Sequence, residues 1–184
     1  MGNPWFRDDV SQMCYNAAKS FQIASSGSWY DDRIMTWNSG NSNPARLVQN
    51  IIGIADYGNN PGQLPVVVKL ETGTANDIFV GFNRARGVNS ASKEANDEVT
   101  VIAQGNNGVG YGKSVLLTSL SSGGSYTIND WQGSGKNMVI TVNSIQKTNP
   151  WFAVVEFNFN NAQGPQPPPP PTSQPSPRPS PKPV

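Results

Sequence analysis

The stretch NMVITVNSIQKTNPWFAVVEFNF, residues 137–159, decides the fold class. From Met138 to Val142 every second residue is apolar, and from Ala153 to Phe159 one alternating set is wholly apolar. Because successive side chains of a strand point to opposite faces of a sheet, both runs predict strands with one buried face. We expect the second run to line the core from an edge of its sheet.

Similar runs recur upstream, separated by clusters of Gly, Asn, Pro and Ser. They are Ile51–Asp56, Pro65–Leu70, Asp77–Phe82, Glu98–Ala103, Lys113–Leu120 and Tyr126–Asn129. Short β-branched or aromatic runs with such punctuation are typical of antiparallel sandwiches and barrels. The sequence therefore predicts a mainly β fold, an antiparallel sandwich or barrel of about seven or eight short strands.

One short N-terminal helix is also predicted. Asp8–Gln22 opens with two acidic residues, which suit a helix N-terminus, and then spaces apolar residues three and four apart. Asn83–Glu94 is mostly polar and predicts a long loop.

The composition changes sharply near Gly164, after which 11 of the 16 prolines occur. A segment with so few apolar side chains and backbone donors favours disordered, solvated polyproline II. At about 3.1 Å per residue it would span roughly 60 Å. Its Ser-Pro alternation is similar to the hydroxyproline-rich, O-glycosylated segments of wall proteins; a linker or a plain tail is the alternative.

The overall charge argues against two classes of partner. The formal net charge is +1 and 14% of the residues are charged, so we expect no nucleic-acid partner. No run of 18 apolar residues and no signal peptide occur in this sequence, so we expect no membrane partner. The lone Cys14 predicts either a buried thiol or a disulfide partner in a longer chain.

The sequence contains no histidine, which removes the commonest metal ligand and the usual general base. Glu94, Asp97 and Glu98 could line a cation site, but solvated loop charge is the favoured interpretation. Lys19-Ser20 and Lys113-Ser114 are adjacent pairs whose side chains should diverge. We therefore assign no catalytic, cofactor-binding or metal-binding residue to this chain.

Three further possibilities stay open. Asp56, Asp77 and Asp130 could include a carboxylate pair for glycoside hydrolysis. The glycine-rich Gly105–Gly112 lacks the spacing of a phosphate loop and favours a hairpin turn. Trp29-Tyr30 with Trp37 could form a sugar-stacking platform, although core packing is the more ordinary role of such aromatic residues.

Several unusual strings resemble the gametolysin-type metallopeptidases, secreted zinc proteases of green algae that degrade hydroxyproline-rich wall glycoproteins. These strings are MCYNAAKSFQ (13–22), LPVVVKLETG (64–73), IFVGFNRAR (78–86), GVGYG (108–112) and YTINDWQGSGK (126–136), together with the proline-rich tail. In that family such strings follow the catalytic zinc site, whose HExxH helix is not present here. The resemblance therefore implies the C-terminal portion of a protease, inactive by itself.

This resemblance implies three regions. Residues 1–28 would be the end of a catalytic domain, with its Met-turn region and last helix; 29–163 would be a β-rich C-terminal module; 164–184 would be the tail. It also implies an extracellular parent that holds zinc, a noncatalytic module that contacts wall glycoprotein or polysaccharide, and a catalytic domain packed on the N-terminal helix. A structural extracellular-matrix protein and a carbohydrate-binding module with a hydroxyproline-rich tail are the alternatives.

Overall fold

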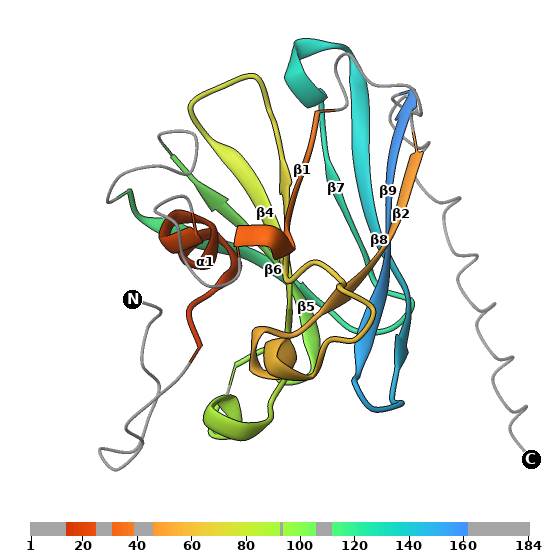
Figure 1. The fold of residues 1–184 in the computed structure, drawn as a ribbon. Coiled ribbons are helices and arrows are strands. Elements are labelled where there is room, and N and C mark those ends of the chain that lie inside the picture. Colours follow the sequence, from red (N-terminus) through yellow and green to blue (C-terminus); the bar gives the residue numbers. More distant parts are fainter. Residues whose placement is uncertain (1–13, 25–30, 39–45, 93, 106–111, 162–184) are drawn as a thin grey trace, which may run out of the picture.

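The computed structural model describes residues 14–24, 31–38, 46–92, 94–105 and 112–161. Within these residues nine strands form two sheets that pack face to face as a sandwich (Figure 1). The five-stranded sheet has the order β1-β3-β4-β5-β6, and the four-stranded sheet has the order β2-β9-β8-β7. The strands are β1 (Ile34–Trp37), β2 (Arg46–Ile52), β3 (Val67–Leu70), β4 (Asp77–Asn83), β5 (Glu98–Gln104), β6 (Ser114–Leu120), β7 (Ser125–Ile128), β8 (Lys136–Gln146) and β9 (Phe152–Asn161).

The main core lies between the two sheets and confirms the predicted alternation. Met138, Ile140 and Val142 of β8 are fully buried, as are Ala153, Val155 and Phe157 of the neighbouring β9. The facing side chains come from β4 and β5, among them Val80 and Val101. The predicted mainly β sandwich is therefore confirmed.

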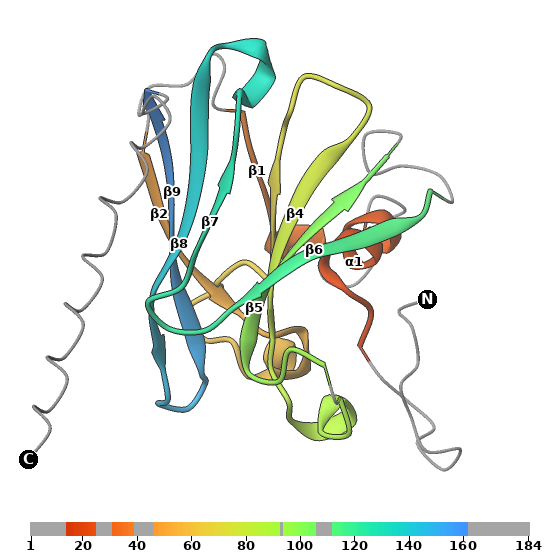
Figure 2. The ribbon, with the colours of Figure 1, turned by 180° about the vertical axis from the view of Figure 1, so that it is seen from behind.

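A second apolar layer lies on the outer face of the five-stranded sheet, where the helix α1 (Ala17–Ala24) covers it (Figure 2). Ala17 and Ala18 pack there against Val67, Phe79 and Ile102. The apolar side of α1 is thus buried against the sheet. No helix in the described ranges has both the length and the apolar character that crossing a bilayer requires.

The helix begins later than the predicted Asp8. Cys14 to Asn16 are not helical, and residues 8–13 lie outside the described residues. The Asn16 side-chain oxygen accepts the backbone N–H of Lys19 at 3.0 Å, which is the geometry of a helix N-cap. The cap explains why α1 starts at Ala17.

One strand prediction was wrong at the boundary between the sheets. The predicted strand Ile51–Asp56 ends at Ile52 and is followed by a 3-10 helix, Ile54–Asn59. Gly53 lies between the end of β2 and this 3-10 helix, and it forms an isolated β-bridge to Phe82. A Cβ on Gly53 would lie 2.4 Å from Cβ of Arg84. Only glycine allows this close approach.

The predicted sheet edge at β9 was also wrong, because β9 lies between β2 and β8. The sequence analysis missed the first half of β2, which supplies the extra partner. It missed β1 as well, which pairs parallel with β3 from Ile34 to Trp37. One sheet therefore departs from the expected antiparallel pattern.

Candidate functional site: a pocket beneath the N-terminal segment

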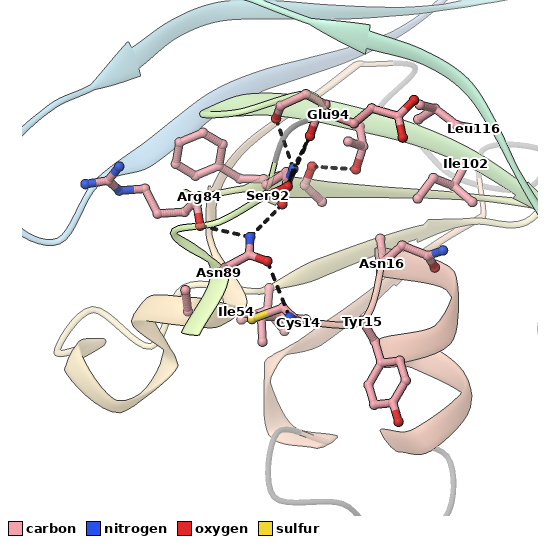
Figure 3. A pocket seen from close by; sticks show the side chains of 18 of the residues that line it. Cys14, Tyr15, Asn16, Ile54, Arg84, Asn89, Ser92, Glu94, Ile102 and Leu116 are labelled. Atoms are coloured by element: carbon pink, nitrogen blue, oxygen red, sulfur yellow. Dashed lines mark hydrogen bonds between the residues drawn. The ribbon is translucent and has the colours of Figure 1, made fainter. Parts of the chain in front are cut away.

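A pocket of about 350 Å³ lies on the outer face of the five-stranded sheet, beside the start of α1 (Figure 3). Its roof is the segment Cys14–Ala17, and its floor includes Val66, Gly81 and Thr100. The loop that follows β4 and the strand β6 form its sides. Its volume is near the lower end of the range of about 300–1,000 Å³ typical of ligand pockets.

The floor is built around a strand position without a side chain, where Ala17 packs directly on the sheet, because a Cβ at Gly81 would lie 2.9 Å from Cβ of Ala17. Gly81 has no side chain, and it pairs across the sheet with Thr100, whose hydroxyl donates to the Gly81 carbonyl at 3.3 Å. Around them stand the apolar side chains of Ile54, Val66 and Ile102. The floor therefore combines apolar side chains with the Thr100 hydroxyl.

One wall is a network of carboxamides. Asn89, which is 3% exposed, donates to the side-chain oxygen of Asn83 at 2.7 Å and accepts the Cys14 backbone N–H at 3.3 Å (Figure 3). Asn83 in turn donates to the backbone oxygens of Glu94 and Ala95. This wall is rigid because its buried polar groups bond to one another.

The opposite wall ties α1 to β6. The Asn16 side-chain nitrogen donates to the Ser114 hydroxyl at 3.0 Å, so one residue both caps the helix and holds it to the strand. At the rim Tyr15 is 47% exposed and Leu116 is 40% exposed. The rim also carries the exposed carboxylate of Glu94.

Arg84 braces the end of the pocket nearest the loop. Its guanidinium lies 2.7 Å from the Asp97 carboxylate and 3.7 Å from that of the buried Asp56, and it stacks on Trp151 at 3.7 Å from the ring centroid. Arg86 also reaches Asp56, at 3.1 Å. These charges neutralise one another, so the bracing is structural.

Cys14 lines the pocket as a free thiol. Its burial raises the pKa of the thiol above the ordinary value, which keeps it protonated and weakly nucleophilic. No other cysteine exists in the sequence to pair with it.

The side chains of the adjacent pairs Lys19-Ser20 and Lys113-Ser114 were expected to diverge, and the hydrogen bonds of the described residues agree with this. Lys19 donates to the side chain of Gln22 and to the backbone oxygen of Gly112, whereas Ser20 donates to the backbone oxygen of Tyr15. Ser114 accepts from Asn16 as described above. Neither serine has the neighbouring lysine as its hydrogen-bond partner.

Each of the three aspartates has a different bonding partner. Asp77 is fully buried at the first residue of β4 and binds Lys69 at 2.9 Å, whereas Asp56 binds Arg84 just past the other end of that strand. Seven residues of strand place these carboxylates about 20 Å apart. Exposed Asp130 caps the Gly135 N–H at 2.8 Å. The first two aspartates are therefore too far apart to flank one glycosidic bond.

Lys69 and Asp77 form a structural ion pair in the sheet. Burial by itself lowers the pKa of Lys69, but its hydrogen bonds to Glu71 and Asp77 outweigh this and raise that pKa. The ammonium therefore stays charged, as a buried partner of Asp77 must.

The described residues contain no group of three or more His, Cys, Asp or Glu side chains placed to hold a metal ion. Asp97 and Glu98 diverge, since Asp97 binds Arg84 and Glu98 accepts from the Ser121 hydroxyl at 2.8 Å. The carboxylates of Asp97 and Glu98 therefore do not converge on the cation site that the sequence left open as the less favoured alternative.

Trp37 does not belong to the sugar-stacking platform that the sequence left open. Trp37 is 7% exposed and packs against Phe157 in the core. Trp29 and Tyr30 lie outside the described residues, as does most of Gly105–Gly112. Trp37 is thus a core residue rather than part of a sugar-stacking surface.

Sequence reasoning missed the residues that make the pocket, above all Gly81, Thr100 and Asn89. One signal was present: an isolated glycine within the strand DIFVGFN indicates a close backbone approach. A Cβ at Gly81 would lie 2.9 Å from Cβ of Ala17, so this is where the N-terminal segment crosses the sheet. The partners across the strands were not readable from the sequence.

Comparison with family models, with curated proteins and with solved structures finds no match for the chain. The resemblance to the gametolysin-type peptidases therefore stays a prediction.

Proposed function

We propose that this chain is the noncatalytic substrate-anchoring part of a secreted, gametolysin-like zinc peptidase, and that its pocket holds an extended proline-rich segment of a wall glycoprotein. The zinc and the hydrolytic chemistry would belong to the parent protein. The observation that carries the proposal is a hollow beside Thr100 that is lined by the apolar side chains of Ile54, Val66 and Ile102 and enclosed by hydrogen-bonded walls.

A proline ring suits this floor. It is apolar, compact and rigid, and its residue has no N–H that would need an acceptor in the pocket. The carboxamides of Asn83 and Asn89 bond to the protein itself, so they shape the wall rather than select a polar ligand. The polyproline II conformation is also already extended before binding, which lowers the entropic cost.

The rim favours a neutral or basic segment. Glu94 contributes an exposed carboxylate there, whereas the charge of Arg84 is matched by Asp56 and Asp97. Exposed Leu116 and Tyr15 extend the apolar surface beyond the pocket, which an extended polypeptide can follow past a single ring.

The apolar side of α1 covers the sheet through Ala17 and Ala18. A catalytic domain packed on this helix, as the resemblance implies, would contact its other side. We assign anchoring to the pocket, with α1 as its roof support.

The test is a binding titration of the whole chain, followed by fluorescence anisotropy, with two fluorescein-labelled peptides of about ten residues, one of proline and one of hydroxyproline. Thr100→Leu fills the floor and should weaken binding about tenfold or more. Thr127→Leu is the matched control, since Thr127 is exposed on β7 away from the pocket.

Leu116→Ala provides a second variant with little risk to folding, because Leu116 is already 40% exposed. It should weaken binding by a smaller factor. If the wild-type chain leaves the anisotropy unchanged, or if Leu116→Ala and a folded Thr100→Leu both bind like the wild type, the proposed site is wrong.

A further inference from the structure

A second, more open hollow of about 630 Å³ lies at the other end of the sandwich. It is formed where the loop between β3 and β4 (72–76) meets the loop between β7 and β8 (129–135), one from each sheet. Both loops are at the top of the ribbon in Figure 1. We call this hollow the loop groove. β4 separates it from the pocket, because Asn76 precedes the strand and Arg84 follows it.

The first loop is held in place from below. The buried carboxylate of Asp77 accepts the Thr72 N–H at 3.0 Å, and the Thr72 hydroxyl donates to the backbone oxygen of Asn76 at 2.8 Å. The Thr74 hydroxyl lies 2.9 Å from that of Thr72. The loop is therefore preorganised rather than dependent on a ligand for its shape.

The second loop is anchored by Trp131, which is 2% exposed and part of the main core. On either side of it Asp130 and Gln132 have φ values of 48° and 57°, which non-glycine residues adopt only at a cost. The Gln132 side chain donates to the backbone oxygen of Glu71 and so joins the two loops. The groove is a built feature with a fixed width.

The lining has the chemistry of a neutral polyhydroxylated ligand. The side chains of Asn76 and Asn129 are exposed, and neither has a hydrogen-bond partner in the described residues. A carboxamide offers both donors and acceptors, which is what a sugar hydroxyl requires. Asp130 adds a carboxylate, and the described lining contains no Lys or Arg, so an anionic ligand is disfavoured.

We propose that the loop groove binds a neutral glycan chain through the carboxamides of Asn76 and Asn129 and the carboxylate of Asp130. Glycan binding here is independent of peptide binding at the pocket, since the two sites share no residue. A glycosylated, proline-rich polypeptide would present a ligand to each.

The experiment is an amide NMR titration of the ¹⁵N-labelled whole chain with neutral hexasaccharides of glucose, xylose, galactose and arabinose, each added separately. At least one should shift the signals of residues 72–76 and 129–133 in a saturable way. The double variant Asn76→Ala and Asn129→Ala should lower that affinity about tenfold. Asn96→Ala is the matched control, because Asn96 is exposed near the opposite end of β5.

Three outcomes would overturn the proposal. The first is that none of the four glycans gives saturable shifts at the loop groove. The second is that the double variant binds as tightly as Asn96→Ala. The third is that a hydroxyproline peptide shifts the loop groove signals and the glycans do not, which would make the groove a peptide site.

Discussion

At Gly81 the strand β4 has no side chain, and this allows Ala17 of α1 to pack directly on the strand at one side of the pocket. In Gly81→Ala the new Cβ would lie 2.9 Å from Cβ of Ala17 and 3.3 Å from the Val66 carbonyl oxygen. We expect α1 to be displaced and the free energy of unfolding to fall by about 1–3 kcal/mol, measured by urea denaturation.

Gly58→Ala is the matched control, since a Cβ there would meet nothing within 4 Å. It should change the free energy of unfolding by no more than about 0.5 kcal/mol. Adding Ala17→Gly to Gly81→Ala should recover part of the loss by removing the clash. A Gly81→Ala protein as stable as the wild type would contradict this account of the crossing.

The carboxyl group of Glu156 makes the stability of the fold depend on pH. Its hydrogen bonds to Arg46, at 2.7 and 2.8 Å, are the main cause that lowers its pKa from 4.5 to about 2, opposed by burial and helped by Asn143. Because the folded-state pKa is the lower one, this stabilisation is present above pH 4.5 and is lost as the pH falls towards 2.

Arg46→Ala should therefore raise the pKa of Glu156 towards 4.5 and flatten the loss of stability in that pH range. A ¹³C NMR titration of the Glu156 carboxyl group measures the shift directly. The pair joins the first residue of β2 to β9, and its Arg46 side chain is 60% exposed. Salt screens such a pair, so its share of total stability is small. An unchanged Glu156 titration in the variant would refute the assignment.

At the level of elements, Asn16 joins α1 to β6. Asn16→Ala removes the cap on the Lys19 N–H and the bond to Ser114, which should cost about 1 kcal/mol and speed amide exchange in α1. Asn16→Asp keeps an acceptor for the cap but loses the donor to Ser114, so its stability should lie between those of the wild type and Asn16→Ala. Equal exchange rates in all three proteins would exclude a capping role.

The strands could be predicted where one face is buried, as in the runs beginning at Met138 and Ala153, because alternation is a local signal. The start of α1 could have been placed from Asn16, a favoured cap residue. β1 was missed because four residues within a turn-rich stretch give too short a pattern, and its parallel partner β3 lies some thirty positions away along the chain.

For the whole molecule, the two hollows result from contacts between segments distant in sequence. The pocket needs Gly81 and Thr100 paired across β4 and β5 near Cys14, and the loop groove needs the loops that carry Asn76 and Asn129 at the same end of the sandwich. Composition showed that this sequence has no histidine, but it did not show where a ligand could lie. The candidate sites therefore came from the tertiary structure.

The central claim is that this chain anchors a proline-rich glycoprotein without cleaving it. The most direct measurement is co-sedimentation of the purified chain with insoluble hydroxyproline-rich wall glycoprotein, with the glycoprotein then examined for cleavage and the chain for bound zinc. We predict that the chain sediments with the glycoprotein, that Thr100→Leu sediments less, and that the glycoprotein stays intact. Cleavage that a chelator abolishes, together with one zinc ion per chain, would contradict the account.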